Sequence, residues 1–261
     1  MRTMVRKGCK MDLSKATVMA VRPNKTVYRY EDTAIKVMNP EYSACDVLNE
    51  AMNLAIVQET GFRVPTLREV RKIDGRWAII YDFIEGVSLD KMMTDDPANT
   101  KQYFERFVDL QIEMHSYTAD RLKYHTDKMK MKINQSGLDA TQRYDLHMRL
   151  DGLPKHKKLC HGDYTPGNVI ITPNDQAYVI DWSHATQGNA SADAARTYLR
   201  HKLAGREDYA EMYMDLFCKK SDTARQYVQK WLAIVASSQL VKKIPEQRDF
   251  LLSWVNFFEF E

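Results

Sequence analysis

The sequence predicts an α+β fold in which a small antiparallel sheet lobe with one helix precedes a larger, mainly helical lobe. Short β-branched and aromatic runs separated by turn residues fill residues 17–83. From residue 95 onward, apolar side chains recur at helical spacing instead. We place the boundary at Gly86, so that residues 1–86 form the N-terminal lobe and residues 87–261 form the C-terminal lobe.

The predicted sheet consists of short strands joined by tight turns. Turn residues at 23–24 and 31–32 separate the first three strands. A helix over residues 41–60 follows, because apolar residues recur there at helical spacing and Gly61 is a suitable C-cap. An Asp-Gly hairpin turn at 74–75 joins the last two strands. The expected strands cover residues 17–21, 26–30 and 33–37, a stretch ending at residue 70, and residues 77–83.

Lys36 is the unusual residue of this predicted sheet. It lies inside the apolar run 34–38, where strand alternation places it on the face opposite Ile35 and Val37. A lysine among such neighbours requires either solvent or an anion to satisfy its charge. Lys36 is therefore either an exposed-face residue or a candidate anion-binding group.

The composition is that of a globular protein without a strong charge bias. The 261 residues are 44% hydrophobic, which is enough for a packed core, and the formal net charge is +3. A balance so close to neutral does not indicate nucleic-acid binding. We read the basic residues 155–158 as solvated surface, and we assign no site to a local basic alternation at Lys128, Lys130 and Lys132.

Cysteine usage and hydropathy predict a cytoplasmic protein. The four cysteines are scattered and form no C-x-x-C pair, so they indicate neither a zinc site nor a disulfide framework. The N-terminal stretch lacks the continuous apolar region of a signal peptide. Residues 231–241 are apolar but too short to span a bilayer, so we expect a buried helix and no membrane association. The cysteines are Cys9, Cys45, Cys160 and Cys218.

The second lobe is read as a series of helices. Residues 95–97, Asp-Asp-Pro, form a suitable helix start, and residues 151–154 contain the Gly and Pro that end a helical stretch. The expected helices cover residues 95–115, 119–135, 140–150, 191–202, 206–218, 222–241 and 247–258.

A hairpin interrupts these helices and carries polar residues at its ends. Residues 169–172 and 177–180 are apolar, β-branched runs separated by four turn-forming residues. With the hairpin centre between residues 174 and 175, Asn168 stands opposite Asp181. Directly opposite residues are about 5 Å apart at Cα, so an amide oxygen and a carboxylate could meet at one hard cation.

Asp163 lies five residues before Asn168, in a loop made irregular by Pro and Gly at 166–167. In phosphoryl transfer, Mg²⁺ bridges nucleotide phosphates while a separate Asp accepts the proton of the attacking hydroxyl. The spacing of His161, Asp163 and Asn168 also fits the kinase catalytic-loop pattern H-x-D-x-x-x-x-N. These positions therefore indicate phosphoryl transfer.

The same segment resembles a known family. His161-Gly162-Asp163, Pro166-Gly167-Asn168 and Ile180-Asp181-Trp182 are similar to the Brenner-type motif and the metal-binding Asp of aminoglycoside phosphotransferases and related choline kinase-like small-molecule kinases. The resemblance implies a two-lobed, protein-kinase-like fold. It further implies that residues 1–86 bind the nucleotide and that residues 87–261 hold the catalytic and substrate-binding groups.

The resemblance also implies a role for each matching residue. Lys36, held by Glu50, would orient the α- and β-phosphates of ATP. Asn168 and Asp181 would bind Mg²⁺, and Asp163 would act as the catalytic base.

Several positions leave alternatives open. Glu41 or Glu59 could take the place of Glu50, and Asp193 resembles a structural acid of the family but could equally be a first-turn helix residue. We read His115 as a structural residue at a helix end.

The turn 21–25 contains none of the glycines that usually cover a nucleotide. Its amides could therefore lie farther from the phosphates, or Asn24 could adopt the left-handed conformation in their place.

The expected function is an ATP- and Mg²⁺-dependent transfer of the γ-phosphoryl group to a hydroxyl of a small molecule, which is aminoglycoside-like, an amino alcohol or a sugar. One alternative is a non-catalytic nucleotide-binding regulatory module of the same fold. Another is a kinase acting on a protein hydroxyl, which is disfavoured because Trp182 follows Asp181 and no A-P-E segment is present. Four acidic residues of the helix 206–218 could attract a polycation or form a solvated face.

Overall fold

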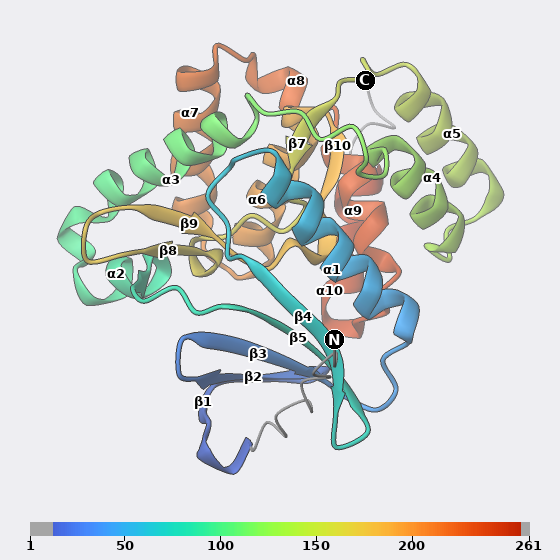
Figure 1. Cartoon of the computed structure of the whole chain (residues 1–261). Coiled ribbons are helices and arrows are strands. Elements are labelled where there is room, and N and C mark those ends of the chain that lie inside the picture. The colour runs from blue at the N-terminus through green and yellow to red at the C-terminus, as the bar shows by residue number, and fades with distance from the viewer. Residues whose placement is uncertain (1–12, 257–261) are drawn as a thin grey trace.

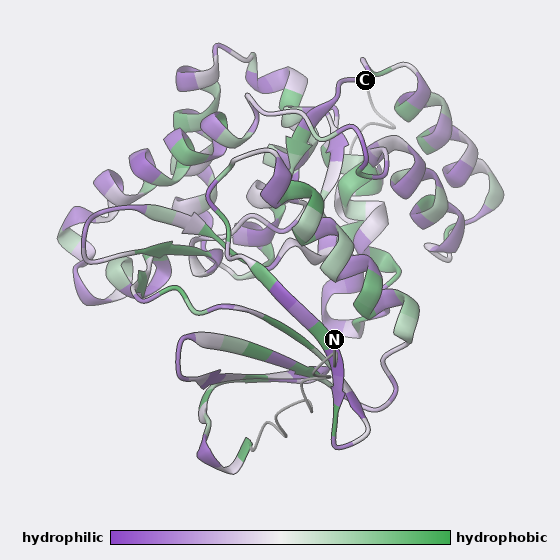
Figure 2. Ribbon diagram, viewed as in Figure 1, coloured by the Kyte–Doolittle hydropathy of each residue, from purple (hydrophilic) through white to green (hydrophobic). Residues whose placement is uncertain are grey.

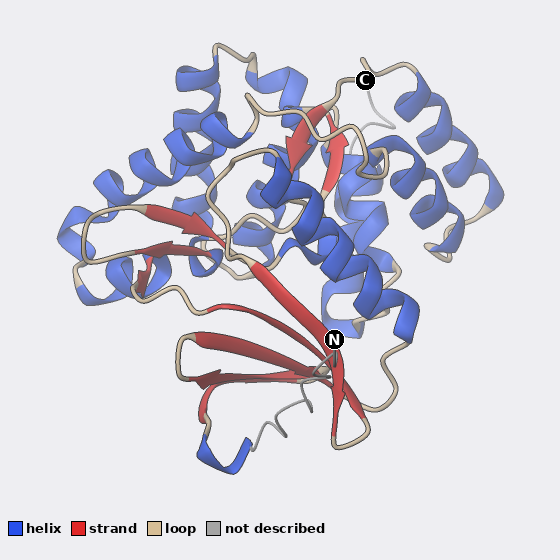
Figure 3. Cartoon of the chain, viewed as in Figure 1, coloured by secondary structure: helices blue, strands red, loops and turns tan. Residues whose placement is uncertain are grey.

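The computed structural model describes residues 13–256, which form a sheet lobe and a larger helical lobe (Figure 1). Figure 3 shows that the long strands belong to the first lobe and most helices to the second. This arrangement is the α+β fold that the sequence predicts.

The sheet lobe contains a five-stranded antiparallel sheet in the order β1-β2-β3-β5-β4. Its hairpins follow from local turn chemistry. Asp74 and Gly75 both have positive φ values, 48° and 78°, which is the conformation of the two-residue turns that match strand twist. The strands are β1 Thr17–Arg22, β2 Lys25–Tyr30, β3 Thr33–Met38, β4 Leu67–Ile73 and β5 Arg76–Asp82.

Strand β3 is buried along its whole length because both of its faces are covered. Ile35 and Val37 pack into an apolar cluster within the sheet, and Met38 packs on its other face against the helix α1, Ala44–Glu59. Lys36 shares the face of Met38, since the two residues are two positions apart in a strand. The side chain of Lys36 is therefore directed toward α1.

The helical lobe is built around helices that bury most of their side chains. Every residue of α9 is buried, and ten residues of α6 are buried. Helices α4 and α5 are two-sided, with polar and apolar residues alternating along them in Figure 2. The helices are α2 Leu89–Asp95, α3 Thr100–Met114, α4 His125–Gln135, α5 Ala140–Asp151, α6 Ala190–Leu203, α7 Glu207–Ser221, α8 Arg225–Gln229, α9 Leu232–Leu240 and α10 Pro245–Asn256.

Three helix predictions are wrong in part. The helix expected over residues 95–115 begins only at Thr100, because Asp95 ends α2 and residues 97–99 form a 3-10 turn. Residues 119–124 are not helical. Their carbonyl oxygens accept hydrogen bonds from Gln187 instead of from helix N–H groups: the side-chain amide and backbone N–H of Gln187 donate to Asp120, Leu122 and Lys123 at 2.6–3.0 Å. The predicted helix 222–241 is divided into α8 and α9, which begins only after Trp231. The last two residues of the predicted helix 247–258 lie outside the described residues.

Two small sheets lie within the helical lobe and carry the loop that holds the candidate catalytic residues. Strand β7, Lys158–Cys160, pairs with β10, Thr186–Gly188. The hairpin of β8, Val169–Ile171, and β9, Ala177–Val179, pairs with the short strand β6, Val87–Ser88. Chain segments on both sides of this loop are therefore held in β-structure.

No helix within residues 13–256 has the length and apolar character needed to cross a membrane.

Candidate active site

Lys36 contacts two carboxylates from distant parts of the chain. Only 2% of Lys36 is exposed, its Nζ is ion-paired with Glu50 of α1, and the same atom lies 2.8 Å from Oδ1 of Asp181. Burial alone would lower the pKa of Lys36, but Asp181 and Glu50 outweigh it and raise the pKa. Lys36 is therefore a buried, charged lysine at the junction of the two lobes.

The structure selects Glu50 among the three glutamates considered as partners of Lys36. Val47, Glu50 and Ala51 lie on the face of α1 that packs against the sheet. Glu59 is instead ion-paired with Arg121, and Glu41 is exposed. Helix periodicity thus places the carboxylate of Glu50 at Lys36.

Asp181 follows β9 and has left-handed backbone angles, φ 67° and ψ 61°. Its carboxylate accepts hydrogen bonds from Lys36 at Oδ1 and from Lys25 at Oδ2, the latter at 2.9 Å. Burial would raise the pKa of Asp181, but the two lysines outweigh it and hold the pKa well below its usual range. The Asp181 side chain is therefore an anionic oxygen donor.

Lys25 is a site residue that the sequence interpretation missed. It ends the glycine-free turn, and only 18% of its side chain is exposed. Burial and the charge of Lys36 lower the pKa of Lys25, while Asp181 opposes this shift. Hairpin register could have identified Lys25, because it pairs with Met38 and thus lies on the same face of the sheet as Lys36.

The turn before Lys25 does not use a left-handed Asn24, because Asn24 is not among the residues with positive φ. Instead, the end of β3 holds the turn: Asn39 donates its backbone N–H to the Asn24 carbonyl at 3.0 Å and its side-chain amide to the Pro23 carbonyl at 2.6 Å. The turn is thereby fixed without glycine.

The predicted register of the β8–β9 hairpin is wrong by one residue. Val169 pairs with Val179, and Ile180 donates its N–H to the Asn168 carbonyl at 2.9 Å, so Asn168 stands opposite Ile180 and not opposite Asp181. The physical reason is the left-handed Asp175, φ 63°, which closes a three-residue loop where the sequence interpretation assumed four.

Asn168 nevertheless offers its amide oxygen, which accepts no hydrogen bond within residues 13–256. Its Nδ2 donates to the backbone carbonyl of Asp163 at 3.0 Å, which leaves Oδ1 unused by that hydrogen bond. An amide oxygen at Asn168 and a carboxylate at Asp181 are the donor types that Mg²⁺ prefers. These residues therefore fit a magnesium site in their chemistry.

The loop that carries Asp163 is anchored by the buried Asp193 in the first turn of α6. Oδ2 of Asp193 accepts from the His161 N–H at 3.1 Å, and Oδ1 accepts from the Gly162 N–H at 2.7 Å. His115 at the end of α3 lies 3.1 Å from Oδ2 through Nε2. Asp193 is thus both a first-turn residue and the acid that holds the loop, and His115 is a structural partner.

His161 connects this loop to the hairpin. Its Nε2 donates to the Ile180 carbonyl at 3.0 Å, and its Nδ1 accepts the N–H of Asp163 at 3.2 Å. Both ring nitrogens are occupied, which leaves His161 to orient the loop. Gly162 has a positive φ of 78°, and a Cβ there would lie 2.6 Å from the His184 carbonyl oxygen.

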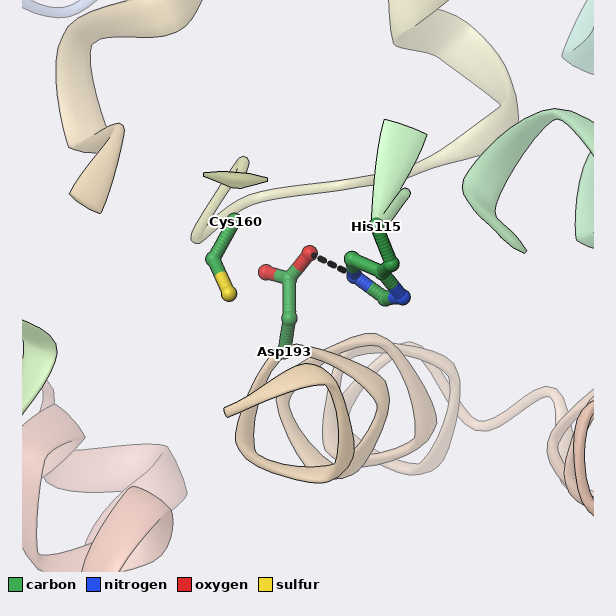
Figure 4. Close-up of side chains that lie close together, drawn as sticks. All are labelled: His115, Cys160 and Asp193. Carbon is green, nitrogen blue, oxygen red and sulfur yellow. Dashed lines mark hydrogen bonds and ion pairs between the residues drawn. The ribbon is translucent and has the colours of Figure 1, made fainter. Parts of the chain in front are cut away.

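His115, Cys160 and Asp193 also form a compact group of possible metal ligands, shown in Figure 4. Both oxygens of Asp193 already accept backbone N–H groups. Burial and the charge of Asp193 raise the pKa of the Cys160 thiol well above its usual value, so the sulfur stays protonated. Asp193, supported by His115, therefore serves as a loop anchor.

Asp163 is paired with two arginines that the sequence interpretation did not select. Arg196 and Arg200 of α6 each place a nitrogen 3.3 Å from Oδ1 of Asp163. Burial would raise the pKa of Asp163, but both arginines outweigh it and lower the pKa. The spacing of residues 193, 196 and 200 could have indicated this arrangement, because it places all three on one helix face.

A cleft of about 690 Å³ lies between α1, α4 and the segment that follows Asp181. Glu50 and Asn53 of α1 line one part of it, and Lys128 and Lys132 of α4 line another, together with His184 from the segment after Asp181. The cleft therefore extends from the Lys36–Glu50 pair toward α4.

Three solved structures with low sequence identity share this fold. A thermostable mutant of the aminoglycoside phosphotransferase APH(4)-Ia, in ternary complex with AMP-PNP and hygromycin B, has a TM-score of 0.68 at 13% identity, covering 94% of this chain and 91% of that chain. Choline kinase LicA from Streptococcus pneumoniae has a TM-score of 0.63 at 13% identity over 93% of each chain. A choline/ethanolamine kinase family protein from Mesorhizobium loti has a TM-score of 0.57 at 16% identity, covering 93% and 84%. These similarities confirm the predicted two-lobed fold.

A family-level sequence comparison agrees with this fold. No protein of curated function matches the chain by sequence. The sequence profile of the phosphotransferase enzyme family matches residues 22–227, which include both lysines, the Asp163 loop and Asp181. This match covers most of the chain and confirms the resemblance seen in its motifs. The chain belongs to the phosphotransferase enzyme family.

Proposed function

We propose that this phosphotransferase moves the γ-phosphoryl group of ATP, with Mg²⁺, to a hydroxyl of a small molecule. The observation that carries the proposal is the contact of Asp181 with the Lys36–Glu50 pair in a chain that also holds Asp163 on an anchored loop. An APH(4)-Ia complex with AMP-PNP and a LicA complex with AMP support nucleotide binding in the shared fold.

Lys36 and Lys25 are the proposed phosphate-binding groups. Glu50 holds Lys36 in place and stabilises its charged form, so that Lys36 can bind the α- and β-phosphates. Lys25 replaces backbone contacts that a glycine-rich loop supplies in other kinases, because its ammonium group reaches the same carboxylate as Lys36. Two cations near Asp181 match the high negative charge of a triphosphate.

Asp181 and Asn168 are the proposed ligands of Mg²⁺, as their anionic and amide oxygens support. When bound, the ion would neutralise charge on the β- and γ-phosphates. Asn168 lies directly before β8 and Asp181 lies shortly after β9, so the two proposed ligands come from neighbouring strands of one hairpin.

Asp163 is the proposed catalytic residue. The acceptor hydroxyl oxygen forms a bond to the γ-phosphorus, the bond from that phosphorus to the β,γ-bridging oxygen breaks, ADP leaves, and the hydroxyl proton passes to Asp163. Because Arg196 and Arg200 lower its pKa, Asp163 is a weak base whose main contribution is to position the hydroxyl.

The segment after Asp181 favours a small acceptor over a protein. It forms one 3-10 turn and the strand β10, and α6 begins at Ala190. This short connection is hydrogen-bonded to residues 120–123, which leaves no long activation segment to bind a peptide.

The proposal also includes the lobe boundary at residue 86 and a cytoplasmic location of the protein.

The test is Mg-ATP-dependent phosphorylation across a panel of small hydroxyl compounds that includes aminoglycosides, choline-like alcohols, amino alcohols, sugars and sugar phosphates. Product formed by the wild type and lost in Asp163→Asn supports the proposal. Mg-ATP binding without product on any acceptor, in a protein whose nucleotide affinity depends on Lys36, favours the regulatory-module alternative.

A further inference from the structure

Five basic side chains, which we term the basic cluster, lie beside Asp163 or beside a small cavity next to its loop. Arg196 and Arg200 contact it directly, and Lys128 and Lys132 of α4 share a small cavity with Arg196 and Gly162. The fifth, Lys242, follows α9, and its charge acts on Lys132. The basic cluster consists of Lys128, Lys132, Arg196, Arg200 and Lys242.

The acids beside the basic cluster do not balance its charge. Asp163 is shared by the two arginines, and Asp193 is committed to His115 and to two backbone N–H groups. Within residues 13–256, Lys132 and Lys242 form no ion pair. Asp46 and Asp127 also line the cleft, but within residues 13–256 neither forms an ion pair with Lys128 or Lys132. The five cations of the basic cluster therefore lie together without a matching number of paired anions.

Burial makes this imbalance costly. Arg196 is only 6% exposed, and its Nη1 has no hydrogen-bond partner in the described part of the chain. Burial, together with the neighbouring cations, lowers the pKa of Lys128 to about 7 and that of Lys132 to about 8. Buried or half-buried cations are unfavourable unless an anion pairs with them. An anionic ligand would remove this penalty.

Two members of the basic cluster, Lys128 and Lys132, are accessible from the cleft. Lys128 and Lys132 line both the small cavity and the 690 Å³ cleft that begins at Glu50. They are four residues apart on α4, so they present their ammonium groups on one helix face. Lys130, on another face of the same helix, is paired with Asp151 at 2.7 Å. Lys128 and Lys132, which face the cleft, thus differ from Lys130, whose charge is paired with a carboxylate outside it.

The ATP phosphates already have two other cations, Lys25 and Lys36, at Asp181. By contrast, Lys128 and Lys132 line a cavity together with Gly162, the residue before Asp163, and with Arg196, which contacts Asp163. The basic cluster is therefore associated with the acceptor side of Asp163, where the hydroxyl has to bind.

We propose that the acceptor is an alcohol that already carries an anionic group, a phosphate or a carboxylate, and that the basic cluster binds this group while the hydroxyl lies at Asp163. This inference rests on the proposed kinase function and specifies its substrate class. A polycation such as an aminoglycoside would be repelled at these positions. The acidic residues of α7 do not offset this, because Glu207, Glu211 and Asp215 are ion-paired with Lys202 and Arg225.

The test is calorimetric titration of the full chain after saturation with Mg-AMP-PNP, which occupies the nucleotide site. The probes are inorganic phosphate, glucose 6-phosphate, glucose and hygromycin B. We expect glucose 6-phosphate to bind at least about tenfold more tightly than glucose, since charge-assisted hydrogen bonds stabilise only the former. Inorganic phosphate should bind as well, and hygromycin B should not.

Matched variants of α4 locate the anion. Lys132→Gln should weaken glucose 6-phosphate binding about tenfold, as removal of one charge-assisted contact predicts. Lys130→Gln, which removes a charge from the same helix but outside the cleft, should leave the affinity unchanged. An equal effect of the two variants would assign the binding to general surface charge and overturn the proposal.

Two outcomes separate this inference from the kinase proposal. If Mg-AMP-PNP binds and neither anionic probe does, or if glucose or hygromycin B binds more tightly than both, the anionic acceptor is wrong and the kinase assignment stands. If Mg-AMP-PNP does not bind, the kinase proposal fails, and the acceptor inference fails with it.

Discussion

At the scale of single residues, Asp181 connects the two lobes at the site. Its two oxygens are divided between Lys36 and Lys25, which come from adjacent strands of the sheet lobe. Each lysine is held by a charge that lies far away in the sequence, because 156 residues separate Lys25 from Asp181. The positions of both lysines at the site therefore depend on the packing of the two lobes.

Asp181→Ala should abolish turnover and leave the fold intact. The variant loses the proposed Mg²⁺ ligand, whereas Lys36 keeps its ion pair with Glu50 and Lys25 can turn toward solvent. Turnover and thermal unfolding by circular dichroism check this expectation. Undiminished turnover would contradict the metal assignment.

Lys25→Met should raise the KM for ATP about tenfold, because one charge-assisted phosphate contact is lost. The effect on kcat should be smaller if the contact is made equally in the ground state and the transition state. The matched control is Arg22→Met, since Arg22 lies on the same turn but is exposed. Equal KM values for the two variants would show that Lys25 contributes only general surface charge.

At the scale of elements, the loop between β7 and β8 owes its shape to one glycine and one acid. Gly162 has a conformation that side chains disfavour, and it lies against the backbone of His184. Asp193 accepts the N–H groups of His161 and Gly162, so the start of α6 supports the loop. Both features act on Asp163 through the backbone that precedes it.

Gly162→Ala should destabilise the protein more than Gly137→Ala. Both glycines have positive φ values, 78° and 74°, so each alanine incurs a left-handed penalty of about 1–2 kcal/mol. Only at Gly162 would the new Cβ lie 2.6 Å from a carbonyl oxygen, because no atom lies within 4 Å of a Cβ at Gly137. Urea unfolding measures the difference, and equal losses would show that the loop can move away.

The Asp193 carboxylate should make stability depend on pH in the acid range. Burial would raise the pKa of Asp193, but the hydrogen bond from His115 and those from the loop lower it to about 2. Because the folded pKa lies below the unfolded one, the stabilisation is complete above about pH 4 and is lost as the pH falls through 2. The shift corresponds to about 2 kcal/mol of unfolding free energy.

The comparison of wild type with Asp193→Asn isolates this contribution from those of other acids. The difference in unfolding free energy between the two proteins should decrease by about 2 kcal/mol between pH 7 and pH 2. Urea titrations at several pH values give the difference directly. Parallel stability curves would mean that Asp193 is not the titrating group.

At the scale of the whole molecule, the site is formed where the lobes meet, so nucleotide binding should stabilise the entire chain. Mg-AMP-PNP at about 100 times its Kd should add about 2.7 kcal/mol to the unfolding free energy and raise the Tm. Lys36→Met should remove most of this gain, because Lys36 is the buried cation at the junction. A Tm that rises equally in both proteins would place the nucleotide elsewhere.

Sequence alone determined the features that depend on neighbours along the chain. Local periodicity predicts the strand around Lys36 and the helix that carries Glu50. Local spacing identifies the motif residues Asp163, Asn168 and Asp181. Such patterns reflect backbone geometry and burial, which repeat every two or 3.6 residues and can be read without the fold.

Tertiary structure decided which of these residues meet. Lys25 reaches Asp181 only because the lobes pack together, and the pairing of Arg196 with Asp163 requires α6 to lie under the loop. The hairpin register depended on the left-handed Asp175, a conformation that non-glycine residues adopt only occasionally. The basic cluster likewise combines α4, α6 and the segment after α9, and no periodicity within one element reveals charges that packing brings together.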